Sequence, residues 1–347
     1  MTWLIYGANG YTGELVARLA AARGERPILA GRSGERLAPL AEELDLAYRV
    51  ADLRDDAALR AALEGVDVVA HCAGPYAATA RPMVAACLAT RTHYVDVTGE
   101  IDVFEWMYAQ DAAAAEASVV LLPGAGFDVV PTDCLAVSLA AALPAATSLE
   151  LAFLAGGGLS RGTARSGLLL AAGGGKRRID GRLVDTPLGE PSRSVPFPRG
   201  ERTVAATVWG DLVTAYRSTG IPNITVYTRL PAQTWASQML RFGPIRRVAD
   251  LVVRRRLGGP SQERRASSGC QVWGEVRDDT GDTRTAWLTG PNGYDLTADA
   301  VVRAVGYVHA GTGPAGPIRA GAHTPATALG AAFVEELDGV SVTVPSG

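Results

Sequence analysis

The first residues join an apolar run to three evenly spaced glycines, and this pattern constrains the fold more than any other in the chain. Trp3–Tyr6 is followed by Gly7, Gly10 and Gly13, and a helical pattern then covers residues 14–23. A strand, a glycine turn and a helix in this order point backbone N–H groups and a helix N-terminus at a pyrophosphate. The sequence therefore predicts a dinucleotide site. A tight turn that binds nothing is the alternative.

The end of the second apolar run indicates which dinucleotide binds. In a site for NAD, an Asp or Glu usually follows this strand and accepts a hydrogen bond from the 2′-hydroxyl of the ribose. Here the run ends with Arg32 and Ser33, and a guanidinium beside a hydroxyl binds a 2′-phosphate that a carboxylate would repel. We therefore predict NADP as the cofactor. The alternative makes Arg32 a solvated surface charge.

Two further strand ends complete the predicted cofactor contacts. Asp52 follows the third apolar run, where its carboxylate either accepts from the adenine amino group or caps the next helix. The fourth run leads into Ala73–Pro75, which brings backbone close to the ribose and nicotinamide or simply turns the chain. The full set of predicted contacts is Gly7, Asn9, Gly10, Tyr11, Thr12, Gly13, Arg32, Ser33, Asp52, Ala73, Gly74 and Pro75.

Short apolar runs alternate with helical patterns over residues 1–131. The predicted strands are Trp3–Tyr6, Ile28–Ala30, Ala47–Val50, Val66–Cys72, Tyr94–Val97 and Val119–Leu122. The predicted helices are Glu14–Arg23, Gly34–Leu44, Asp56–Leu63, Ala78–Thr90 and Ile101–Ala117. Because this alternation is typical of a parallel sheet with helices on both faces, we predict an α/β fold whose N-terminal domain is a doubly wound Rossmann domain.

The pattern changes after Pro131 and predicts a second, α+β domain over residues 132–321. A helix is predicted over Thr132–Ala142. Strand-like runs then alternate apolar with polar residues, at Leu149–Leu154, Thr203–Trp209, Ile224–Thr228, Gln271–Arg277 and Arg284–Thr289. This alternation favours a mostly antiparallel or mixed sheet. The last predicted elements, helix Pro325–Leu337 and strand Val340–Val344, lie in residues 322–347, which we expect to complete the first domain.

Composition and charge narrow the function classes. A formal net charge of −3 gives no overall basic field for nucleic acid, and no apolar run reaches the ~20 residues of a membrane span. The four cysteines are too widely spaced for a metal cluster or a disulfide framework. We therefore predict reduced thiols and no metal. With no signal peptide visible, we expect a cytoplasmic protein.

The positions of lysine exclude one enzyme class. Extended short-chain dehydrogenases also carry a glycine loop of this spacing, but they need a Tyr-x-x-x-Lys pair in which lysine lowers the pKa of the tyrosine. The only lysine here is Lys176, and the residue four positions before it is Ala172. That chemistry is excluded in its usual form.

Several short motifs follow one another along nearly the whole chain. They are Gly7–Gly13, Ala30–Ser33, Cys72–Tyr76, Tyr94–Glu100, Pro123–Asp133, Arg161–Ser166, Gly259–Ser261, Val272–Val276 and Thr324–Gly330. Together they resemble the saccharopine dehydrogenase-like oxidoreductases, specifically the bacterial branch described as trans-acting enoyl reductases. This resemblance implies an NADP-binding Rossmann domain, a substrate-binding and dimerisation domain, and reduction of a C=C bond in a polyketide, lipid or other secondary-metabolite intermediate.

Two other functions remain open. The wider family that the chain resembles also includes enzymes that form or reduce imines, so an imine reductase or amine dehydrogenase of the saccharopine dehydrogenase type is one alternative. A non-catalytic NADP-binding accessory protein is the other, because the sequence shows no obvious proton donor. Family resemblance supports the fold more firmly than the reaction.

Four residues are candidates for the chemistry beside the cofactor. Tyr76 follows a Gly-Pro turn and either donates a proton or packs as an aromatic plug. Asp128 either orients the cofactor amide or the substrate, or caps the next helix. Thr163 and Arg165 follow three glycines at a predicted helix start, where backbone N–H groups and a guanidinium stabilise an oxyanion. A loop–helix junction with capping hydroxyls is the alternative for this pair.

Three other polar residues near strand ends are given structural roles. Asp96 and Glu100 flank the end of the fifth apolar run, and we interpret them as capping and domain-contact groups rather than acids. His71 lies within the fourth run and is predicted to be a hydrogen-bonded core residue.

An arginine-rich stretch over residues 245–257 predicts a basic amphipathic helix. Such a helix docks an acidic carrier protein or a membrane surface, or it is a solvated face at the edge of a dimer. The predicted substrate is a small molecule or a carrier-bound one, and the expected assembly is a homodimer.

Overall fold

A computed structural model describes residues 1–158, 160, 162, 164, 174–229 and 258–343. The chain divides into two compact units. The first comprises Met1–Val130 and Tyr294–Leu337, and the second comprises Pro131–Gly293 and Asp338–Gly347. These units differ from the predicted domains, because the segment that returns to the first unit begins at Tyr294 rather than at residue 322. Residues from Asp338 onward belong to the second unit.

The first unit is built on a parallel sheet. Its strands are β1 (Trp3–Tyr6), β2 (Ile28–Gly31), β3 (Tyr48–Val50), β4 (Val68–His71), β5 (His93–Asp96), β6 (Val120–Leu122) and β17 (Gly321–Ala322). The order across the sheet is β17-β6-β5-β4-β1-β2-β3, with every neighbouring pair parallel. The first six strands thus lie in the order β3-β2-β1-β4-β5-β6, which is that of the doubly wound dinucleotide-binding fold. The predicted α/β Rossmann architecture is therefore confirmed.

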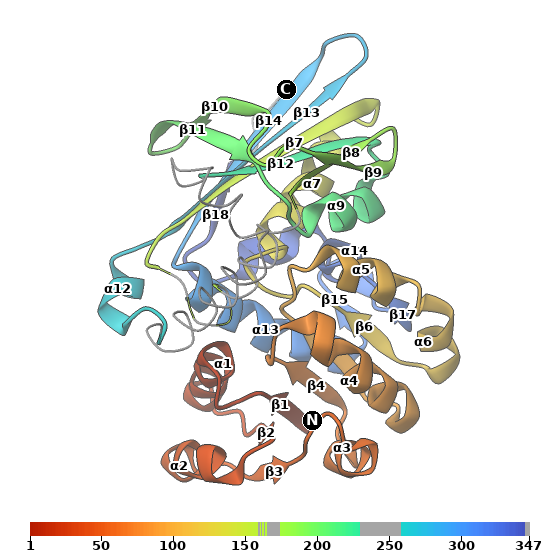
Figure 1. The fold of residues 1–347 in the computed structure, drawn as a ribbon, viewed down its shortest axis with the longest axis vertical. Coiled ribbons are helices and arrows are strands. Elements are labelled where there is room, and N and C mark those ends of the chain that lie inside the picture. The colour runs from red at the N-terminus through yellow and green to blue at the C-terminus, as the bar shows by residue number, and fades with distance from the viewer. Residues whose placement is uncertain (159, 161, 163, 165–173, 230–257, 344–347) are drawn as a thin grey trace. The chain divides into compact units, whose positions relative to one another are not determined.

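Helices cover both faces of this sheet. They are α1 (Tyr11–Ala22), α2 (Gly34–Leu44), α3 (Asp56–Leu63), α4 (Tyr76–Thr90), α5 (Ile101–Tyr108), α6 (Asp111–Ala117), α13 (Gly293–Ala310) and α14 (Pro325–Leu329). In Figure 1, α1 and α2 lie on one side of strands β1 to β4, and α3 and α4 lie on the other. A short 3₁₀ helix, η1 (Ala331–Glu336), and a two-stranded ribbon, β15 (Thr312–Gly313) with β16 (Gly316–Pro317), complete the unit.

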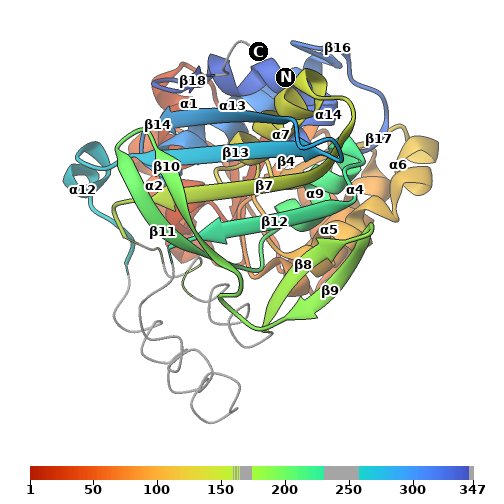
Figure 2. The same ribbon diagram turned by 90° about the horizontal axis from the view of Figure 1, so that it is seen from above.

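The second unit is built on a mixed sheet, as predicted. Its strands are β7 (Ala146–Ala155), β8 (Gly175–Ile179), β9 (Arg182–Thr186), β10 (Ser192–Phe197), β11 (Gly200–Ala206), β12 (Asn223–Thr228), β13 (Cys270–Asp278), β14 (Thr283–Gly290) and β18 (Ser341–Thr343). Strands β7 and β12 pair in parallel and the other neighbours are antiparallel. Figure 2 shows β12, β7, β13 and β14 side by side.

The sheet of the second unit packs apolar residues on both faces. On one face α7 (Val130–Ala142) approaches so closely that a Cβ at Gly274 would lie 2.7 Å from the Leu139 side chain. On the other face, Val195 and Phe197 of β10 belong to a buried apolar cluster with Trp273 of β13. Helices α9 (Asp211–Thr219) and α12 (Gln262–Ala266) complete the described part of the unit.

Several predicted elements differ from those observed. The expected helix over residues 101–117 is two helices, α5 and α6, and the expected helix over 325–337 is α14 followed by η1, with Gly330 at φ +88° between them. The last strand, β18, pairs with β14 of the second sheet rather than returning to the first. Helix α13 and strands β8 to β10 were not predicted. The predicted basic helix over residues 245–257 lies outside the described residues.

No helix within the described ranges is both long enough and apolar enough to span a bilayer.

Candidate functional site

The glycine loop after β1 forms a tight cradle at the start of α1. Gly7 has φ +83°, and the N–H of Gly10 donates to its carbonyl oxygen at 2.9 Å. A Cβ at Gly13 would lie 2.3 Å from that same oxygen, so only glycine allows α1 to pack this closely on the loop. Gly10 is the N-cap residue of α1, and no side chain of the described residues caps it. The first turn of α1 is therefore suited to an anionic ligand.

The N-terminus of α4, at the same edge of the sheet, is closed in a different way. The carboxylate of Glu100 accepts hydrogen bonds from the N–H groups of Tyr76 at 2.9 Å and Ala77 at 2.8 Å. A negative charge of the chain itself thus occupies this helix terminus. No carboxylate among the described residues caps α1 in this way, so of these two termini α1 is the one suited to a pyrophosphate.

The residues predicted to select the 2′-phosphate lie at the end of β2. Arg32 is exposed, and it makes no ion pair within the part of the chain that the structure describes. Ser33 is the N-cap residue of α2, yet its side chain makes no capping hydrogen bond. A Cβ at Gly31 would lie 3.2 Å from the Asn9 amide oxygen, so the glycine loop and the end of β2 adjoin each other.

Asp52 does not cap the following helix. Its carboxylate accepts hydrogen bonds from Arg54, from the backbone N–H at 2.9 Å, from Nε at 3.1 Å and from Nη2 at 2.8 Å. These bonds hold the pKa of Asp52 well below its ordinary value. Asp55 instead caps α3, accepting from the N–H of Ala58 at 3.0 Å. The capping alternative for Asp52 is therefore wrong, and sequence reasoning missed Arg54 as its partner.

The turn after β4 lies against the glycine loop. A Cβ at Gly7 would meet the Cβ of Ala73 at 2.8 Å. The N–H of Cys72 donates to the carbonyl of Tyr6 at 2.8 Å, which continues the pairing of β4 with β1 into the turn. Gly74 is exposed. The structure therefore brings Ala73, but not every predicted contact, directly against the pyrophosphate loop.

Tyr76 points into the protein. Its side chain is only 7% exposed, and its hydroxyl donates to the carbonyl of His71 at 3.1 Å. Its ring meets the His71 ring edge-on, with 5.5 Å between centroids. Burial holds the pKa of the hydroxyl well above its ordinary value. This arrangement favours the packing alternative over proton donation.

His71 is buried, as predicted, but its ring is not hydrogen-bonded. Neither ring nitrogen has a partner among the residues that the structure describes. The ring lies among three tyrosine rings, those of Tyr6, Tyr76 and Tyr94. Burial lowers its pKa to about 3. The prediction of a hydrogen-bonded core histidine was therefore wrong on the hydrogen bonds and right on the burial.

Replacing His71 with phenylalanine is expected to make the protein more resistant to acid. Between the ordinary pKa of histidine and a pKa of about 3, the unfolded chain binds a proton that the folded chain excludes, so the folded state loses stability as the pH falls below about 6.5. His71→Phe removes this loss, which we expect to reach about 2–3 kcal/mol between pH 7 and pH 4.5. Urea unfolding at both pH values measures it, with His309→Phe as the exposed control. Parallel stability profiles of wild type and variant would contradict it.

Two carboxylates near the carboxyl ends of β5 and β6 have raised pKa values. Asp96 is buried and accepts from the Tyr94 hydroxyl at 2.6 Å and from the N–H groups of Thr98 and Gly124 at 2.9 Å each. It ties β5 to the loop after β6, in agreement with its predicted structural role. Burial raises its pKa to about 6.

Asp128 lies on the loop after β6, close to the loop after β5. A Cβ at Gly99 would lie 3.2 Å from its carboxylate. The loop is fixed by the N–H of Phe127, which donates to the Thr297 hydroxyl of α13 at 2.9 Å. Burial raises the pKa of Asp128 to about 6. A carboxyl group that titrates near neutral pH is able to hold or release a proton under physiological conditions.

The two remaining catalytic candidates cannot be placed. Thr163 and Arg165 lie outside the described residues. The glycines before them are described: the Asn292 amide donates to the Gly156 carbonyl and to the Ser268 hydroxyl, at 2.9 Å each. Asn292 is buried. It thus anchors the glycine segment that leads toward these candidates. Within the described ranges no group of three or more His, Cys, Asp or Glu side chains is placed to hold a metal ion.

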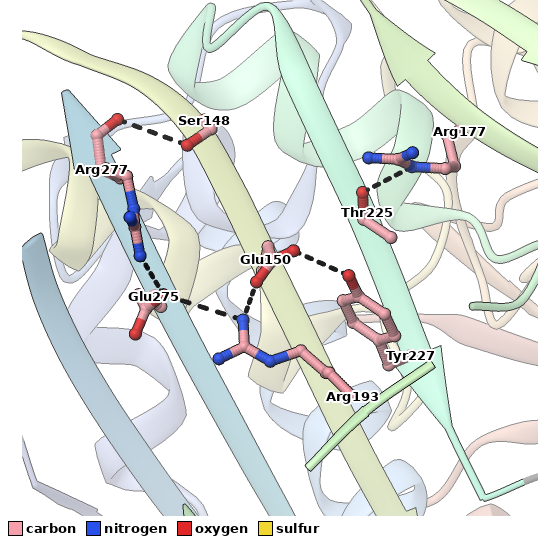
Figure 3. Close-up of polar contacts among 8 residues, drawn as sticks. All are labelled: Ser148, Glu150, Arg177, Arg193, Thr225, Tyr227, Glu275 and Arg277. Carbon is pink, nitrogen blue, oxygen red and sulfur yellow. Dashed lines mark hydrogen bonds and ion pairs between the residues drawn. The ribbon is translucent and has the colours of Figure 1, made fainter. Parts of the chain in front are cut away.

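A second polar cluster lies on the sheet of the second unit, and its charges satisfy one another (Figure 3). Arg193 pairs with Glu150 and Glu275, and its guanidinium lies 4.6 Å from the centre of the Trp273 ring. The Tyr227 hydroxyl donates to Glu150 at 2.7 Å. Further contacts join Arg277 to Glu275, Ser148 to the Arg277 carbonyl, and Arg177 to Thr225. Two carboxylates face two guanidinium groups, so we interpret the Glu150–Glu275 cluster as structural.

Comparison with known proteins supports an NADP-binding domain at the N-terminal end of this chain. Residues 3–122 match the family model of the saccharopine dehydrogenase NADP-binding domain. A trans-acting enoyl reductase of Mycobacterium leprae is 38% identical over 146 residues, which are 38% of this chain and 33% of that protein. A saccharopine dehydrogenase-like oxidoreductase of Bos taurus is 29% identical over 150 residues, 38% of this chain and 35% of that protein. The alignments thus span about a third of the length of these relatives.

A solved structure resembles the chain over nearly its whole length. It is the apo, histidine-tagged saccharopine dehydrogenase (L-Glu forming) of Saccharomyces cerevisiae, with a TM-score of 0.64 over 99% of this chain and 100% of that one. The two sequences are 15% identical. This likeness therefore shows that they share a fold.

Proposed function

Since residues 3–122 belong to the saccharopine dehydrogenase NADP-binding domain family and NADP is therefore the cofactor, we propose that this chain is an NADPH-dependent reductase. Its substrate is a polyketide, lipid or other secondary-metabolite intermediate, and it reduces an enoyl C=C bond of that molecule. The observation that carries the proposal is the N-terminus of α1, which no described side chain caps, beside Arg32, which forms no ion pair with the described residues. The choice of a C=C bond rests on the relatives named trans-acting enoyl reductases.

The described residues suit the two phosphate groups of NADP. The N–H groups at the start of α1, beside Gly10, would hold the pyrophosphate, and Arg32 and Ser33 would hold the 2′-phosphate. Ala73 narrows the cradle next to Gly7. When bound, NADPH supplies a hydride, so the chain itself must orient the acceptor and manage one proton.

Asp128 is our proposed proton source. Its carboxyl follows β6 at the carboxyl edge of the parallel sheet, where ligands of this fold bind. With a pKa near 6, it is partly protonated at neutral pH. Tyr76 is less suited to this role because its hydroxyl is committed to the carbonyl of His71. Thr163 and Arg165 are the proposed oxyanion contacts. We further propose that the substrate is carrier-bound, that the protein forms a homodimer and that it is located in the cytoplasm.

An assay with two acceptor types tests the proposed reaction. Purified protein is incubated with NADPH and crotonyl-pantetheine, or with a 2-oxo acid and an amine, and the products are identified by mass spectrometry. Enoyl reduction gives a saturated thioester that is heavier by two hydrogens. Reduction confined to the imine mixture would transfer the proposal to the saccharopine dehydrogenase type of chemistry. NADPH binding without turnover of either acceptor would favour the accessory-protein alternative.

Replacing Asp128 with asparagine is expected to lower turnover and raise stability. The folded chain favours the protonated carboxyl, so ionisation costs the folded state progressively more stability as the pH rises from about 4 to about 6. Asparagine removes that cost and the proton. We expect at least about a tenfold lower kcat and a higher Tm at pH 8. Asp102→Asn, on the exposed side of α5, is the control, and an unchanged kcat in Asp128→Asn would remove Asp128 from the mechanism.

A further inference from the structure

Strands β2 and β3 place two loops side by side at the carboxyl edge of the first sheet. They pair in parallel with Gly31 opposite Val50, and the N–H of Ala51 donates to the Gly31 carbonyl at 3.0 Å. The residues that follow, Arg32 and Asp52, therefore emerge at the same edge. The loop after β3 thus adjoins the proposed 2′-phosphate site.

The loop after β3 is held firmly. The Tyr6 hydroxyl, at the end of β1, donates to the Ala51 carbonyl at 2.9 Å in a buried position. Asp55 closes the loop by capping α3. Between these two anchors, Arg54 is bound through its backbone N–H, Nε and Nη2 to the carboxylate of Asp52. The guanidinium is consequently oriented although its side chain is 88% exposed.

The stability of the fold does not explain this arrangement. An ion pair at the protein surface contributes little to stability, and Asp52 and Arg54 are separated by a single residue of the same loop. A guanidinium that is already oriented does, however, lose less conformational freedom when it binds a phosphate. Two of its five N–H groups face Asp52, which leaves others free to donate to a ligand.

We propose that Arg54 is a second guanidinium for the 2′-phosphate of NADP and that Asp52 positions Arg54 rather than reading the adenine. With Arg32, the two guanidinium groups and one carboxylate give the site a net charge of +1, which suits a phosphate monoester. The proposal rests on the cofactor half of the proposed function and is independent of which bond is reduced.

Binding of two cofactor fragments tests the proposal without any turnover. The fragments are 2′-phospho-AMP and AMP, which differ only in the 2′-phosphate, and their Kd values are measured by calorimetry. Arg54→Ala is expected to weaken 2′-phospho-AMP about five- to tenfold and to leave AMP within about twofold. Arg54→Lys should recover part of the loss. Arg60→Ala is the matched control, because Arg60 is an exposed arginine that pairs with Asp56 within α3.

A double-mutant cycle tests the positioning role of Asp52. Asp52→Ala should weaken 2′-phospho-AMP when Arg54 is present, because the guanidinium loses its orientation. In the Arg54→Ala background, the same change should strengthen binding, because only the repulsion between carboxylate and phosphate is removed. Tighter binding in both backgrounds would overturn the positioning role.

Two other results would overturn the proposed contact. Equal weakening of both fragments by Arg54→Ala would place Arg54 on the adenine, and no weakening would place it outside the site. If the unmodified chain bound neither fragment, the proposed cofactor site would itself be wrong. Enoyl reduction that fails while both fragments bind as expected would overturn only the proposed reaction.

Discussion

Replacing Gly13 with alanine is expected to lower the free energy of unfolding by about 2 kcal/mol or more and to abolish cofactor binding. The new Cβ would lie 2.3 Å from the Gly7 carbonyl oxygen and 2.9 Å from the Cα of Ala8. Both neighbours are backbone atoms, so neither can move aside by a side-chain rotation. Helix α1 must therefore shift away from β1, and its first turn moves away from the pyrophosphate site.

The matched control is another helical glycine of the same unit. Gly306 lies within α13 and a Cβ there meets no atom within 4 Å. Because alanine favours a helix by up to about 1 kcal/mol over glycine, Gly306→Ala should leave stability unchanged or raise it. Urea unfolding of both variants measures the difference, and NADPH titration measures the loss of binding. Equal stability of the two variants would show that α1 does not pack on the loop as tightly as described.

The parts of the fold that were predicted correctly depend on short-range patterns. Strand β1, helix α1 and the glycines between them are specified by residues within about twenty positions of one another. The predicted helices over residues 34–44 and 56–63 match α2 and α3 residue for residue. Each of these helices buries a regular stripe of apolar residues. Hydrophobic periodicity detects this kind of element well.

Helix α13 was missed because distant contacts define its buried face. It buries Thr297 and Asp299 together with its apolar residues, which obscures the helical period. Thr297 accepts from the N–H of Phe127, and Asp299 pairs at 2.6 Å with Arg23, the C-cap residue of α1. These partners lie far away in the sequence. No local pattern could therefore have shown that this segment returns to the first unit.

The candidate site divides in the same way. The cradle of Gly7, Gly10 and Gly13 follows from local backbone geometry, and it could be predicted. The roles of Tyr76 and Asp52 depended on which neighbour their polar atoms would meet, a carbonyl for the first and Arg54 for the second. The raised pKa of Asp128 comes from burial, which a loop sequence rich in glycine and valine does not reveal.

Replacing Arg32 with alanine is expected to remove most of the preference for NADPH. We expect the unmodified chain to bind NADPH at least about tenfold more tightly than NADH, because the 2′-phosphate meets a guanidinium that forms no ion pair with the described residues. A hydrogen bond to a charged group contributes about 1.5–3 kcal/mol, which corresponds to about ten- to one-hundredfold in Kd. Arg32→Ala should therefore weaken NADPH by about this factor and leave NADH within about twofold.

Fluorescence titration with both dinucleotides measures this selectivity. Arg26→Ala is the control, because Arg26 precedes β2 at the opposite edge of the sheet and pairs with Asp45. Higher salt should reduce the preference of the unmodified chain more than that of Arg32→Ala, since exposed charges are screened. Equal affinities for NADPH and NADH in the unmodified chain would contradict the role of Arg32. The preference for NADPH could instead survive in Arg32→Ala and disappear only when Arg54 is also replaced. That result would make Arg54, in the loop after β3, the principal ligand of the 2′-phosphate, because the remaining preference would then come from its guanidinium.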